Sequence, residues 1–369
     1  MEQLDIGYAD TTSSLVETLA SRVGRTWEHL RLARQRALAQ HQRLRQALSL
    51  FDSSDSSIVV FGSLARDEWT PASDVDWTLL IDGMADPAHL DVAIEIRRKL
   101  VTMGVKSPGR EGTFGTLAFS HELIHQIGGE DDTNSNTTRR ILLLSESHVV
   151  GRREAYDRVL SNVLLRYLSE DRGLWYGSSD FKVPRFLLND IARYWRTVAV
   201  DFAYKQRTRG NEGWALRNIK LRMSRKLLFI SGLLTCFSCH LQITPEERET
   251  IYRNHAVQPL VRHLQKIVAL TPMELVAKTL LGFEELLQPA ARLFDSYNDF
   301  IGMLADEGRL SNGKTPRKHL EEIAVEELDS DPTFQRAREI SHAFQEAVRD
   351  IFLRSNTELS KLTVEYGVF

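Results

Sequence analysis

Residues 58–82 read IVVFGSLARDEWTPASDVDWTLLID, two apolar runs joined by a polar turn. The first run, residues 58–61, is β-branched and aromatic and stops at Gly62 and Ser63. Such a run before a glycine predicts a buried strand that feeds a tight turn. The chain therefore begins an α/β unit here, and we work outward from it.

The second apolar run, residues 75–81, has Asp74 at its entrance and Asp76 inside it. Side chains alternate along a strand, so residues two apart point to the same face. We therefore expect the two carboxylates to converge. Two carboxylates at one point repel each other unless a cation lies between them.

The residues of this stretch suit a metal ion and a phosphate. Mg²⁺ prefers hard oxygen ligands and is usually held by one or two carboxylates together with substrate phosphates. Gly62 lets a phosphate approach the backbone, and the Ser63 hydroxyl and neighbouring N–H groups can hold it. We therefore expect Mg²⁺, with Mn²⁺ as the alternative, at Asp74 and Asp76 in a phosphoryl or nucleotidyl transfer site.

Gly-Ser followed by a spacer and Asp-x-Asp resembles the motif of the DNA polymerase β-like nucleotidyltransferases. The spacer, with Arg66, Thr70, Pro71 and Ser73, looks most like that of the adenylyl- and uridylyltransferases of nitrogen regulation. The resemblance covers residues 58–82. It implies transfer of a nucleoside monophosphate from a nucleoside triphosphate to a protein side chain or an RNA, with release of pyrophosphate. A nucleotide second-messenger synthase of the same superfamily is the alternative.

The resemblance also implies a third carboxylate on a third strand, which we place at residues 116–127, although the pattern of this segment alone also permits a helix. Glu122 is the only acid in that segment, so we expect it to join Asp74 and Asp76 as a catalytic and metal-binding residue. Asp131 and Asp132 are the reserve candidates, although their polar segment also suits a loop and a helix cap.

Glu122 belongs to a competing motif, HELIH at residues 121–125. On a helix, HExxH binds Zn²⁺ through both histidines and uses the glutamate as general base. On a strand, His121 and His125 share one face while Glu122 points to the other. Because we expect a strand bounded by glycines, a zinc-dependent hydrolase is the less favoured hypothesis.

A basic segment follows later in the chain. Residues 193–226 hold ten lysines or arginines and two acids. In a helix predicted at residues 214–235, Arg222, Arg225 and Lys226 are spaced i, i+3 and i+4 and form one stripe. The stripe is either a solvated face or a clamp for a triphosphate or nucleic-acid backbone. The expected nucleotide-binding residues are Gly62, Ser63, Arg66, Lys220, Arg222, Arg225 and Lys226.

The remaining pattern is helical. Residues 14–50 predict an amphipathic arm that Gly24 interrupts, residues 141–150 predict an apolar helix, and no strand is predicted after Gly151. Thr-Pro-x-Glu at residues 244–247 and 271–274 begins two further helices. The predicted fold is α+β, a small mixed-sheet nucleotidyltransferase core (52–151) between an N-terminal helical arm (1–51) and a C-terminal all-helical domain (152–369).

Composition limits the partners. The 369-residue chain has a net charge of -3, so any nucleic-acid contact needs a local basic patch. Two cysteines give no disulfide framework. The chain has no apolar run long enough to span a membrane and no signal-peptide pattern, so we expect a cytoplasmic protein without membrane contact. The helical domain is expected to bind the acceptor, a protein partner or a second copy of the chain.

Overall fold

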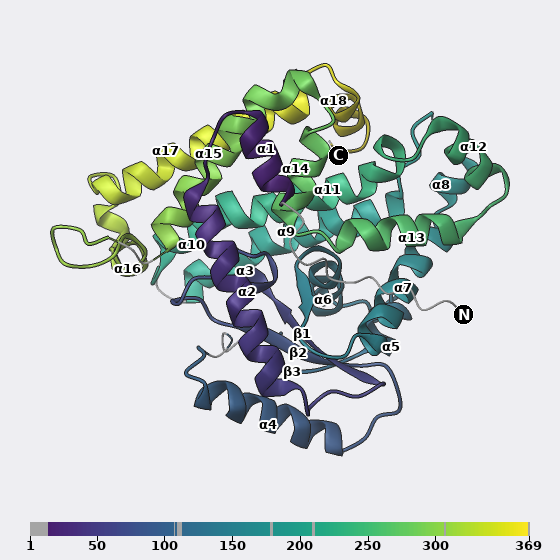
Figure 1. Cartoon of the computed structure of the whole chain (residues 1–369), viewed down its shortest axis with the longest axis horizontal. Coiled ribbons are helices and arrows are strands. Elements are labelled where there is room, and N and C mark those ends of the chain that lie inside the picture. Colours follow the sequence, from purple (N-terminus) through teal and green to yellow (C-terminus); the bar gives the residue numbers. More distant parts are fainter. Residues whose placement is uncertain are drawn as a thin grey trace.

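A small sheet lies at one end of the molecule, beneath a larger group of helices (Figure 1). The computed structural model describes residues 14–106, 108, 113–177, 180–208, 211–305 and 308–367. Arg209, one of the ten basic residues counted above, lies outside them. The architecture is α+β, a small mixed sheet with a helical C-terminal region, as expected from the sequence.

The sheet has four strands in the order β3-β2-β1-β4. Their bounds are β1 (Ser56–Phe61), β2 (Asp76–Ile81), β3 (Thr116–Phe119) and β4 (Ser147–Val149). β1 runs antiparallel to β2 and β4, whereas β2 and β3 are parallel. The short helix α3 (Gly62–Ala65) follows β1 directly, and Phe61 pairs with Asp76. The motif residues Gly62 and Asp76 therefore meet at one end of the sheet.

Both faces of the sheet are covered. Ile58, Val60 and Leu79 join an apolar cluster with α2 (Glu28–Leu48) and α4 (Ala88–Thr102). Val59 and Leu80 point to the opposite face and join the large cluster of the helical region. This alternation explains why the runs in residues 58–82 are apolar without a polar side, since each face has its own apolar partner.

The remaining helices form the larger part of the molecule. They are α1 (Leu15–Arg22), α5 (Ser120–Ile124), α6 (Asn134–Ser145), α7 (Glu154–Ser169), α8 (Arg172–Tyr176), α9 (Arg185–Thr208), α10 (Trp214–Lys220), the π-helix η1 (Leu221–Arg225), α11 (Lys226–Leu241), α12 (Pro245–Arg253), α13 (Val257–Val268), α14 (Pro272–Leu280), the 3₁₀ turn η2 (Glu284–Leu286), α15 (Leu287–Leu304), α16 (Pro316–Glu322), the 3₁₀ turn η3 (Val325–Glu327), α17 (Pro332–Arg349), the π-helix η4 (Asp350–Arg354), α18 (Glu358–Leu362) and the π-helix η5 (Thr363–Gly367). Within the described ranges no single helix is long and apolar enough to cross a membrane. One pair bent by 90°, Trp214–Leu241 with Pro245–Arg253, passes that test by length and composition only.

The N-terminal arm lies against the C-terminal helices. The backbone N–H of Leu15 donates to the Glu274 carboxylate of α14 at 2.8 Å, and the Trp27 indole donates to Asp295 of α15 at 2.8 Å. Gly24 has a φ of +64° between α1 and α2, so the expected break is confirmed. The arm is tied to residues more than 250 positions away in the sequence.

Three element predictions are wrong in part. The third strand ends at Phe119, and the rest of residues 116–127 begins with α5. The helix predicted at residues 141–150 ends at Ser145, and the three residues of β4 pair with β1. The helix predicted at residues 214–235 contains the π-helix η1. In each case strand pairing or local helix geometry overrides the periodicity of the sequence.

Candidate active site

The site centres on Gly62 and Asp76. Gly62 has a φ of +70°, a conformation that residues with a side chain rarely adopt. A Cβ added at this position would lie 3.2 Å from Oδ2 of Asp76. Glycine is therefore required for both the turn and the close approach of the carboxylate.

Asp76 lies in an environment that opposes its negative charge. Burial and, after it, the neighbouring carboxylate of Asp74 together raise the pKa of Asp76 to about 7, against the opposing effect of the Arg225 guanidinium. The Asp74 carboxylate thus lies close enough to Asp76 to affect its pKa, although Asp74 precedes β2 and is not related to Asp76 by alternation along the strand. A proton or a metal cation would stabilise an acidic pair held in this way, because it relieves the repulsion between the carboxylates.

Two of the predicted cations face this pair. Burial, together with the Arg317 guanidinium, lowers the pKa of Lys220 to about 8, and the Asp74 carboxylate counteracts the shift. Arg225 is close enough to lower the pKa of Asp76 and donates to Glu146 at 3.2 Å. α10 and η1 therefore bring one lysine and one arginine to the acidic pair.

The other two predicted cations point elsewhere. Arg222 is exposed, and the Lys226 ammonium donates to Gln345 of α17. A π-helix closes its hydrogen bonds from i to i+5, so it shifts the phase of the side chains relative to an α-helix. The predicted single stripe of Arg222, Arg225 and Lys226 is therefore divided between two directions.

Glu146, which the sequence analysis missed, links Arg66 and Arg225. It caps the end of α6 directly before β4 and is 3% exposed. Its carboxylate accepts hydrogen bonds from both arginines. Arg66 is itself buried and also donates to Glu68 at 2.9 Å. The Arg66 guanidinium is thus held by two carboxylates beside the site where we expected it to meet a nucleotide.

The helical region fixes the spacer of the motif. Arg317 of α16 donates to the Thr70 hydroxyl at 3.1 Å and to the Ala72 carbonyl at 2.9 Å. The hydroxyls of Thr70 and Ser73 lie 3.0 Å apart. These contacts hold the turn that delivers Asp74 into the site.

The structure does not bring the expected third carboxylate to the pair. Glu122 lies on α5 with its side chain 42% exposed, 3.6 Å from Arg139. In the described part of the chain, no three His, Cys, Asp or Glu residues form a group that could hold a metal ion. In this structure Glu122 is thus paired with Arg139 and does not form a three-carboxylate group with Asp74 and Asp76.

The reserve candidates serve other contacts. Asp132 accepts hydrogen bonds from Arg140 at 2.9 Å and from Arg193 at 3.0 Å, and Asp131 is exposed in the loop before α6. Neither reserve candidate therefore joins Asp74 and Asp76.

The HELIH segment adopts a helix where we had predicted a strand. Residues 120–124 form α5, His125 caps it, and the rings of His121 and His125 lie 5.1 Å apart. The two histidines therefore share one side, as HExxH requires. Over the described ranges, however, no third ligand joins them in a metal-binding group.

Comparison with known proteins agrees with the position of this site. Residues 41–106 match the family model of the nucleotidyltransferase domain. The matched segment contains β1, α3, the spacer, β2 and α4. No curated protein and no solved structure matches the chain.

Proposed function

Residues 41–106 form a nucleotidyltransferase domain, so the chain is a transferase, and we propose that it moves a nucleoside monophosphate from a nucleoside triphosphate to a protein side chain or an RNA. Pyrophosphate leaves in this reaction. One observation supports the proposal most directly: the acidic pair Asp74 and Asp76 lies beside Gly62 and faces Lys220 and Arg225. The carboxylates of such a site can bind a metal ion, and its basic side chains can bind phosphates.

Asp74 and Asp76 are the residues that would hold Mg²⁺, or Mn²⁺ in its place. Burial and the mutual repulsion of the two carboxylates raise the pKa of Asp76, so a cation bound between them is favoured. Two carboxylates with substrate phosphates and water are a usual ligand set for Mg²⁺. When bound, the ion neutralises the negative charge that develops on the transferred phosphate.

The protein's own residues orient the triphosphate. Gly62 lets the Asp76 carboxylate lie against the turn, because a Cβ there would be 3.2 Å from Oδ2 of Asp76. Lys220 and Arg225 offer cations to the phosphates beside the acidic pair, and Glu146 fixes the direction of the Arg225 guanidinium. An acceptor hydroxyl would then attack the α-phosphorus, and pyrophosphate would leave.

The experiment compares Asp76→Asn with Asp91→Asn, a matched change at an exposed position on α4. Each protein is incubated with Mg²⁺, each α-labelled nucleoside triphosphate and a cell extract, and labelled product and pyrophosphate are measured. We expect Asp76→Asn to lose at least about 100-fold in rate, because the metal and phosphates lose a ligand. Asp91→Asn should match the wild type. Full Mg²⁺-dependent transfer by a folded Asp76→Asn protein overturns the proposal.

The same labelling identifies the acceptor class. A labelled macromolecule that protease destroys is a modified protein, and one that ribonuclease destroys is a modified RNA. We expect one of these two results. A small labelled product that resists both enzymes identifies a nucleotide acceptor and favours the second-messenger alternative instead.

A further inference from the structure

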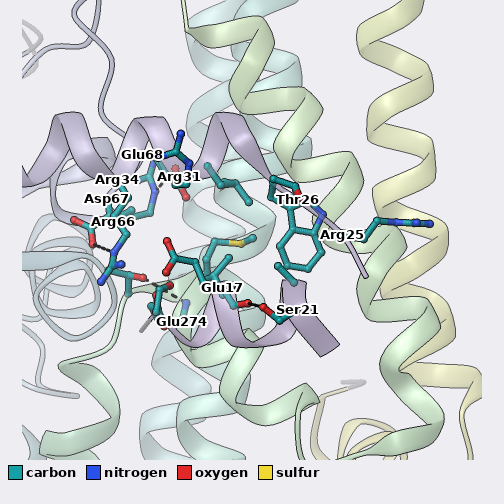
Figure 2. A pocket seen from close by; sticks show the side chains of 17 residues that line it. Glu17, Ser21, Arg25, Thr26, Arg31, Arg34, Arg66, Asp67, Glu68 and Glu274 are labelled. Atoms are coloured by element: carbon teal, nitrogen blue, oxygen red, sulfur yellow. Dashed lines mark hydrogen bonds and ion pairs between the residues drawn. The ribbon is translucent and has the colours of Figure 1, made fainter. Parts of the chain in front are cut away.

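A pocket of about 230 Å³ lies between α1, α2, α14 and the turn that follows α3 (Figure 2). Trp27, Leu30 and Met273 give it an apolar wall. Charged side chains gather on the opposite side, among them Arg34, Asp67 and Glu274 (Figure 2). The pocket therefore combines an apolar surface with a charged one.

Most of the charges around the pocket are already neutralised within the protein. Arg31 donates to Glu28, and Arg25 donates to Asp295. The Glu274 carboxylate accepts from the first residues of the arm, Ser14 and Leu15. Arg66 and Glu68, which form the back wall, bind each other at 2.9 Å. These groups shape the pocket and have little capacity left for a ligand.

Asp67 is different from these neighbours. Its side chain is only 21% exposed, and among the described residues its carboxylate receives no hydrogen bond. The nearest nitrogen atoms of basic side chains, Nε of Arg34 and Nε2 of His41, lie 3.8 and 3.9 Å away, beyond hydrogen-bond distance. Nε of Arg34 is buried and also has no hydrogen-bond partner. A donor and an acceptor at the pocket are thus both unsatisfied.

The unsatisfied charges favour a cationic ligand. Glu17 adds an exposed carboxylate on the pocket lining, and no described residue donates a hydrogen bond to that carboxylate. Among the charged groups of the lining that lack a hydrogen bond, two carboxylates then face the single guanidinium of Arg34. A neutral apolar ligand would leave the Asp67 carboxylate without a hydrogen bond, which costs free energy.

We propose that this pocket binds a small organic cation, with its ammonium held by Asp67 and Glu17 and its apolar body against Trp27, Leu30 and Met273. An ammonium offers three donors to the two carboxylates, and the wall removes the carbon skeleton from water. The site is distinct from the acidic pair. It adjoins the active site through Arg66, which also binds Glu146. Binding at the pocket does not depend on the proposed transfer reaction.

The charge state of Asp67 gives the proposal a pH signature. Burial, helped by Glu274 of α14 and the adjacent Glu68 and opposed by Arg34, raises the pKa of Asp67 to about 7. Burial lowers the pKa of His41 on α2 to about 4, so this histidine stays neutral above that pH. A cation needs ionised Asp67, so binding should strengthen as the pH rises through 7.

The test measures binding of benzylamine to the full-length chain by calorimetry, without nucleotide. Benzylamine is a cation at pH 6 and pH 8, and benzyl alcohol is its neutral counterpart. We expect the wild type to bind benzylamine about tenfold more tightly than benzyl alcohol, and more tightly at pH 8 than at pH 6. Asp67→Asn should lose about tenfold in affinity at pH 8 and most of the pH dependence.

Asp91→Asn is the matched control and should bind as the wild type does. Asparagine keeps the size of Asp67 and tolerates its φ of +60°, so the variant is expected to fold, which thermal unfolding checks. The proposal is overturned if the wild type fails to bind benzylamine, if benzyl alcohol binds equally well, or if Asp67→Asn binds like the wild type. Since no nucleotide is present, none of these results depends on the transferase assay.

Discussion

Lys220 is a basic side chain that the fold places beside the acidic pair Asp74 and Asp76. It is half-buried, and the Asp74 carboxylate acts on its charge. Lys226, only six residues later, donates to Gln345 on α17 instead. Lys220 therefore lies beside the acidic pair, whereas Lys226 makes a contact within the helical region.

We predict that Lys220→Met raises the KM for the nucleoside triphosphate about 10- to 100-fold, because a charge-assisted hydrogen bond to phosphate is worth about 1.5–3 kcal/mol. Lys226→Met should change the KM by less than about threefold. Steady-state kinetics of both variants, with thermal unfolding as a check of folding, tests this difference. An equal effect of the two substitutions would contradict the assignment of Lys220 to the phosphates.

Asp67 should also affect stability. Its folded pKa of about 7 lies above the ordinary value of 3.8, so the folded state binds a proton that the unfolded state has lost. The stabilising contribution is complete below pH 3.8 and is lost as the pH rises through 7. We predict that Asp67→Asn is more stable than the wild type by about 1–3 kcal/mol at pH 8, with a smaller difference at pH 5. Urea unfolding at both pH values measures it, and a gain that is larger at pH 5 would refute it.

Glu146 illustrates which contacts of a single residue can be predicted from the sequence and which cannot. An acid between Leu144 and Val149 requires a partner if it is buried, and this signal was present in the sequence. Its partners Arg66 and Arg225 are 80 and 79 positions away, so no local pattern names them. Asp74 and Asp76 could be paired because they lie two positions apart in the sequence, although only Asp76 belongs to β2.

Helix starts and strands follow the same rule: local patterns could be read from the sequence, and long-range partners could not. Thr244 has the full capping box that Thr-Pro-x-Glu predicts, and Thr271 accepts from the Glu274 N–H. The Glu274 side chain, however, reaches the start of α1, which lies far away in the sequence. β3 and β4 have four and three residues, too few for periodicity to identify them. Short strands are defined by the partners they pair with.

α16 lies outside the Gly-Ser and Asp-x-Asp motif but holds the spacer between them through Arg317. Arg317 is 8% exposed and holds both Thr70 and Ala72. We predict that Arg317→Met destabilises the protein by about 1–3 kcal/mol, because it leaves buried acceptors without their donor. The rate of transfer should also fall, since the turn before Asp74 loosens. Urea unfolding and initial rates measure the two effects.

Lys318 provides the neighbouring control for this prediction. It pairs at the surface with Glu322 at 2.9 Å, and its side chain is 54% exposed. Lys318→Met should therefore change stability by less than about 0.5 kcal/mol. Arg317→Lys should recover little, because one ammonium cannot reproduce two contacts of a planar guanidinium. Full stability and activity in Arg317→Met would show that the spacer holds its position without α16.

At the scale of the whole molecule, the sheet packs against helices that precede it and helices that follow it in the sequence. α2 covers one face from before the strands, and the large cluster that covers the other draws on α7, α11 and α15. The sequence predicted a catalytic core at residues 52–151 because its motifs lie there. The packing that stabilises that core involves residues on either side, and these long-range contacts leave no local signal.

We therefore predict that residues 52–151 do not fold alone. The fragment lacks α2, so Ile58, Val60 and Leu79 lose one of the two helices that cover them. It also lacks α7 and α11, so Val59 and Leu80 lose most of their cluster. A sheet whose apolar faces are only partly covered gains too little from burial to offset the conformational entropy of ordering the chain. Near-UV circular dichroism and urea titration should show no cooperative transition for the fragment, whereas the full chain should show one. A sharp transition and dispersed amide NMR signals from residues 52–151 would prove that the core is an independent domain.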